Sequence, residues 1–143
     1  MATIINMHKA VRRIKLDDTP ESPEFTLDLT DDGMQRKAVA MAGACAVYRK
    51  LVQDCESNGI TDSIKERMAA IYHVIVDVML GDGAFDKIML WTAGGTDVPA
   101  HEVTMAFAPL IAYLVDEYDM VLTANKSEAV ARYLDGVEDA DAL

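Results

Sequence analysis

The chain has few of the residues that would tie it to several common classes of protein. Its 143 residues include only two cysteines, four prolines, three phenylalanines and one tryptophan. No uninterrupted apolar run approaches membrane-spanning length, and the N-terminus lacks the apolar core of a signal peptide. We therefore expect a soluble intracellular protein that does not bind membranes.

Positive charge is also scarce. Thirteen lysines and arginines stand against 24 acids, which gives a net charge of −11. A nucleic-acid binder neutralises phosphates with clustered cations, so we expect no nucleic-acid partner. Four of the cations, Lys9, Arg12, Arg13 and Lys15, precede the first acid, Asp17. They form either a docking arm for an acidic partner or, as we favour for so short a run, one solvated strand face.

The two cysteines, Cys45 and Cys55, fall on one predicted helix. At the standard helical rise they lie roughly 15 Å apart, too far for a disulfide. Both lie on the apolar stripe, so we interpret them as buried thiols in a reducing cytoplasm.

Half of the positions are hydrophobic, enough for one core and one domain. Residues 1–30 predict an N-terminal strand or arm element. Within it, residues 3–16 are ambiguous, residues 17–24 form a turn or loop, and the alternating FTLDL at residues 25–29 predicts a strand.

Residues 31–134 are predicted to form a helical bundle. The first long helix begins at Thr30 or Asp31 and ends at Gly59, and the second begins at Thr61 or Asp62. The expected fold is mainly α: a small bundle of three long helices and one or two short ones, with a short N-terminal β-strand or hairpin element.

The second helix ends in GDGAFDKI, Gly81 to Ile88, where two glycines supply the backbone freedom for a turn. We expect Asp82 to cap the short helix that follows. A third long helix runs from about residue 100 to 123, with a kink near residues 105–109 because Pro109 removes a backbone hydrogen bond.

Beyond the third helix, residues 126–134 can form a last short helix. Residues 135–143 carry four acids and no base, which predicts a disordered acidic tail.

The pattern of ionisable residues suggests no catalytic chemistry. His101 and Glu102 resemble the start of a zinc-protease helix, but Met105 stands where the second histidine would be. His73 lies one turn before Asp77, and we interpret it as a partly exposed structural histidine. We expect no catalytic residue, no cofactor site and no metal site, and a protein that is not an enzyme.

The order of these elements resembles a known family. A strand segment ending in FTLDLTDD, a long helix, a second helix ending in LGDGAFDKI, a loop and an apolar helix are similar to the tail assembly chaperones of long-tailed (siphovirus-type) bacteriophages and prophages. The resemblance covers roughly residues 24 to 125.

The resemblance implies a non-enzymatic protein that binds the tape measure protein and keeps its apolar helices from aggregating. The tail tube protein is a second candidate partner. The chaperone would act in the bacterial host cytoplasm and be absent from the mature virion. The alternative is a structural virion protein, either a head-tail connector or a tail completion protein. Self-association stays open.

A chaperone of this kind needs exposed, adaptable apolar surface together with enough charge to remain soluble. The candidate partner-binding residues lie around the glycine junction: Met79, Phe85, Ile88, Met89 and Trp91. The alternative is that Phe85 and Trp91 close the end of the bundle as core residues.

Overall fold

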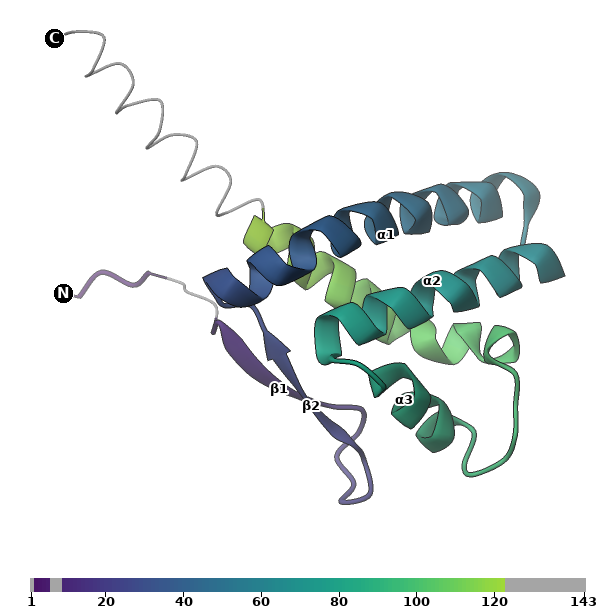
Figure 1. The fold of residues 1–143 in the computed structure, drawn as a ribbon, viewed down its shortest axis with the longest axis horizontal. Helices are drawn as coiled ribbons and strands as arrows, with labels where there is room; N and C mark the ends of the chain where they lie inside the picture. The colour runs from purple at the N-terminus through teal and green to yellow at the C-terminus, as the bar shows by residue number, and fades with distance from the viewer. Residues whose placement is uncertain (1, 6–8, 123–143) are drawn as a thin grey trace, which may run out of the picture.

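The computed structural model describes residues 2–5 and 9–122. The elements are β1 (Val11–Lys15), β2 (Glu24–Asp28), α1 (Asp31–Asn58), α2 (Asp62–Leu80), α3 (Ala84–Thr92), a 3₁₀ turn (Ala100–Glu102) and a helix over residues 104–122. The predicted mainly α fold with an N-terminal hairpin is therefore confirmed (Figure 1). The short helix predicted at 126–134 and the acidic tail lie outside the described residues.

The hairpin pairs β1 and β2 antiparallel, with Ile14 opposite Phe25. Phe25 and Leu27 are buried, which fits the alternation of FTLDL. The connecting loop is held by the buried Ser22, whose hydroxyl oxygen accepts the backbone N–H of Leu16 at 2.9 Å. The ambiguous N-terminal run thus becomes a strand because its partner strand packs on the bundle.

The ends of α1 and α2 follow the capping pattern of the sequence. The hydroxyl of Thr30 accepts the Gly33 N–H, and the hydroxyl of Thr61 accepts the Ile64 N–H, both at 3.2 Å. Gly59 ends α1 with φ of 77°, a left-handed value that favours glycine. The predicted boundaries of both helices are confirmed.

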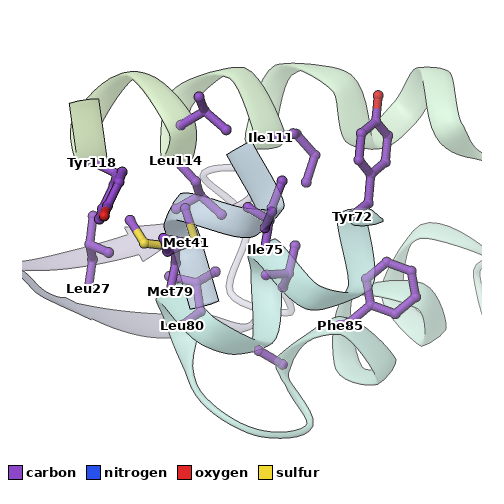
Figure 2. Close-up of a cluster of buried hydrophobic side chains, with 14 of the residues drawn as sticks. Leu27, Met41, Tyr72, Ile75, Met79, Leu80, Phe85, Ile111, Leu114 and Tyr118 are labelled. Carbon is purple, nitrogen blue, oxygen red and sulfur yellow. The ribbon is translucent and has the colours of Figure 1, made fainter. Parts of the chain in front are cut away.

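The core lies between the three long helices, β2 and α3. α1 and α2 lie side by side, and the helix over residues 104–122 crosses behind them (Figure 1). Figure 2 shows the buried side chains that fill this space, and the largest fully buried ones are Leu27, Met41, Ile75, Met79, Ile111 and Leu114. Tyr118 donates a hydrogen bond to the Ala38 carbonyl at 3.3 Å, which joins the last helix to α1.

The third long helix starts later than the sequence predicts. A 3₁₀ turn occupies Ala100–Glu102, and the α-helix begins at residue 104. The Val103 carbonyl accepts N–H groups from both Ala106 and Phe107, at 3.1 and 3.2 Å, so the helical ladder starts anew there. The predicted helix is therefore interrupted at Val103, which precedes the residues 105–109 where a kink is expected from Pro109.

Among the described residues, no one helix has the length and apolarity needed to cross a membrane. Only α2 and α3 taken together meet those criteria, and they are bent by 117° from each other.

Candidate partner-binding groove

The α2–α3 junction turns the chain sharply back on the bundle. Gly81 and Gly83 have φ values of 109° and 83°, and other residues rarely adopt such values. Gly83 occupies the N-cap position of α3, where no side-chain cap hydrogen bond forms. The prediction that Asp82 caps α3 is wrong. The carboxylate of Asp77, on α2, reaches across the bend and accepts the Phe85 N–H at 2.9 Å.

Phe85 is held between two other rings. His73 stacks on one side, with ring centroids 4.5 Å apart, and Phe107 on the other at 4.9 Å. The imidazole Nε2 of His73 also lies 3.1 Å from Oδ2 of Asp77. Asp77 therefore contacts both the ring that covers Phe85 and the backbone of Phe85, and the junction is rigidly packed.

The five predicted partner-binding residues do not form one exposed surface. Met79, Phe85 and Ile88 are only 1%, 4% and 3% exposed, and they belong to the core. Met89 is half-buried, while Trp91 is 36% exposed. Helical spacing marked these positions as apolar, but it does not show which of them a neighbouring element covers.

Ile88 and Trp91 do contribute to a groove. This groove has a volume of about 560 Å³ and lies between the hairpin, α3 and the helix over residues 104–122. Its apolar lining also includes Ile14, Leu16, Phe107, Leu110 and Tyr113. The hairpin residues were not predicted to bind a partner. In the sequence, only the alternation of Ile14 and Leu16 with Arg13 and Lys15 indicated a strand with one apolar face.

The charged residues that line the groove are basic. Among the residues that the structure describes, Arg13 and Lys15 belong to the lining and no acid does, although the chain carries a net charge of −11. The nearest carboxylate to Arg13 is that of Glu24, whose Oε1 lies 3.7 Å from Nε. Lys15 donates to the Thr19 carbonyl at 3.1 Å. Both cations are exposed and keep hydrogen-bond donors for another acceptor.

Arg12 points the opposite way, towards the helix over residues 104–122. Its guanidinium forms an ion pair with the Glu117 carboxylate and donates to the Tyr113 hydroxyl at 3.4 Å. The hydrogen bond to Tyr113 and the neighbouring Glu117 raise the pKa of Arg12. The basic segment is thus divided: Arg12 fastens β1 to the helix, while Arg13 and Lys15 remain at the groove.

No group of three or more metal-ligating side chains occurs within the described part of the chain. Cys45 and Cys55 are free thiols. Cys45 is buried as predicted, but the prediction is wrong for Cys55, which is only half-buried near the C-terminal end of α1. Comparison of the chain with protein family models, with curated proteins and with solved structures found no match.

Proposed function

We propose that this protein is a tail assembly chaperone of a long-tailed bacteriophage or prophage, which binds the tape measure protein without catalysing a reaction. The groove is the observation that carries the proposal. It offers apolar side chains from three elements to a partner, on a chain whose acidity keeps it soluble.

The resemblance of FTLDLTDD and LGDGAFDKI to that family supports the identity of the partner. The two motifs form defined elements that lie beside each other, since both contribute residues to one hollow. The first forms β2 and the start of α1, and the second forms the bend from α2 into α3. Because both motifs shape the bundle and carry no reactive chemistry, they fit a binding protein better than an enzyme.

The proposal is tested by co-expressing the chain with the candidate tape measure protein of the same phage or prophage. We expect the tape measure protein to stay in the soluble fraction, and to be captured with this chain, only when this chain is present. An insoluble tape measure protein in both cultures would contradict the proposal.

Mass spectrometry of purified virions separates the chaperone from the alternative. A chaperone is absent from the particle, whereas a connector or tail completion protein is present in fixed copy number.

A further inference from the structure

The outer edge of β1 has unused backbone hydrogen-bonding groups. The Leu29 N–H donates to the Ala10 carbonyl at 2.7 Å, and these two residues face each other in the register of the hairpin. In an antiparallel ladder, hydrogen-bonded pairs alternate with pairs that are not hydrogen-bonded. The bonded pairs are therefore Arg12 with Leu27 and Ile14 with Phe25.

The residues between them present their backbone groups to the outside. The N–H and C=O groups of Val11, Arg13 and Lys15 point away from β2, and none of them has a backbone partner among the described residues. The same rule turns the Asp28 carbonyl outwards on β2, where the Lys37 ammonium donates to it at 2.8 Å. Within residues 2–5 and 9–122, the outer edge of β2 is thus partly occupied, whereas that of β1 is free.

This free edge borders the groove. Four consecutive residues, 13–16, line it, and no residue of β2 does. Consecutive residues of a strand point to opposite faces, so the strand meets the groove along its edge. A third strand laid beside β1 would place alternate side chains against the apolar wall of Ile88, Trp91 and Leu110.

We propose that the groove binds an extended segment of a partner protein by strand addition to β1, and that this segment alternates apolar and acidic residues. The apolar side chains enter the groove, and the acidic ones pair with Arg13 and Lys15. That the segment belongs to the tape measure protein rests on the proposed function. The mode of binding does not.

The positive charge of the β1 edge also disfavours binding of a second copy of this chain at this edge. Pairing β1 with β1 of another copy would bring Arg13 and Lys15 of both chains together, and like charges on adjacent strands destabilise a sheet. Exposed basic residues protect an edge strand from self-pairing. Here the same residues attract an acidic strand.

The experiment uses two nine-residue peptides, one alternating valine with glutamate and the other valine with lysine. Trp91 is the only tryptophan of the chain and lies in the groove, so its fluorescence reports binding. We expect saturable binding of the glutamate peptide at least tenfold tighter than that of the lysine peptide. Hydrogen exchange at the Arg13 and Lys15 amides should slow at least tenfold when the glutamate peptide is bound.

Arg13→Pro and Arg13→Ala together separate backbone pairing from charge. Both lose the guanidinium, but only the proline variant also loses the outward N–H, which the hairpin does not use. The fold is retained in both, and Arg13→Pro should bind the glutamate peptide at least tenfold more weakly than Arg13→Ala. Arg12→Pro removes an N–H bonded to β2 and should disrupt the hairpin itself. Exchanging both Arg13 and Lys15 for glutamate should reverse the preference to the lysine peptide. The matched double exchange of Lys50 and Arg67, which line a different hollow, should leave it unchanged.

Equal binding of the two peptides, unchanged amide exchange, or binding by folded Arg13→Pro as tight as that by Arg13→Ala would overturn strand addition. The peptide measurements do not involve the tape measure protein. Tight glutamate-peptide binding with a failed co-expression would support strand addition and contradict the chaperone assignment. A successful co-expression by the Arg13→Pro variant would support the chaperone assignment and contradict strand addition as the way in which the tape measure protein is bound.

Discussion

Replacing Asp77 by alanine should loosen the α2–α3 junction, while replacing Asp82 should not. The Asp77 side chain accepts the Phe85 N–H at 2.9 Å and lies 3.1 Å from Nε2 of His73. Loss of a capping hydrogen bond costs about 1 kcal/mol. The expected decrease in unfolding free energy is therefore about 1 kcal/mol.

The assay is urea unfolding at neutral pH, with thermal unfolding beside it. Unfolding entropy of about 2.1 cal/mol/K per residue makes 1 kcal/mol equivalent to a fall in Tm of about 3 °C for this chain. Asp82→Ala is the matched control, because it removes an exposed acid from the same turn and should change stability by less than about 0.5 kcal/mol. Equal destabilisation by the two variants, or none by Asp77→Ala, would refute the assignment of the cap.

Three further substitutions test the packing of the bundle. Burial raises the pKa of Tyr72 to about 12 from its usual 10, so the folded state favours the neutral phenol. The contribution of the neutral Tyr72 phenol to the unfolding free energy is fully present below pH 10 and is lost as the pH rises towards 12. Between pH 8 and 11 the wild type should therefore lose about 1.3 kcal/mol more than Tyr72→Phe in urea unfolding, and parallel losses would contradict this. Gly43→Ala should stabilise α1 by about 0.5–1 kcal/mol, because the added Cβ meets nothing within 4 Å. Gly33→Ala should destabilise the protein in the same thermal assay, because its Cβ would lie 2.7 Å from the Asp28 carbonyl oxygen. A gain in stability at both glycine positions would show that Asp28 of β2 does not pack closely against Gly33 of α1.

The sequence predicted the features of the fold that depend on neighbouring residues. Thr30, Thr61 and Gly59 mark helix ends through hydrogen bonds and backbone angles within one turn. Asp82 failed as a cap because the choice of acceptor depends on the bend between α2 and α3. That bend brings Asp77 to the Phe85 N–H, and no local pattern contains this information.

The candidate site was only partly predictable for a related reason. Helical spacing identifies Phe85, Ile88 and Trp91 as apolar, but burial depends on elements that are distant in sequence. Phe107 covers Phe85, and the hairpin supplies Ile14 to the groove beside Ile88 and Trp91. Strand alternation places Arg12 and Arg13 on opposite faces, but only the packing of β1 near Glu117 shows that Arg12 is the inward one.

Site-specific photo-crosslinking during tail assembly tests the central claim most directly. A photoreactive phenylalanine analogue replaces Trp91 in the groove or, as the control, Val74, which is 42% exposed and lines a different hollow. We predict a crosslinked product with the tape measure protein from position 91 and none from position 74, in cells that are assembling phage. No crosslink to the tape measure protein from position 91, or a product found only in finished virions, would contradict the account.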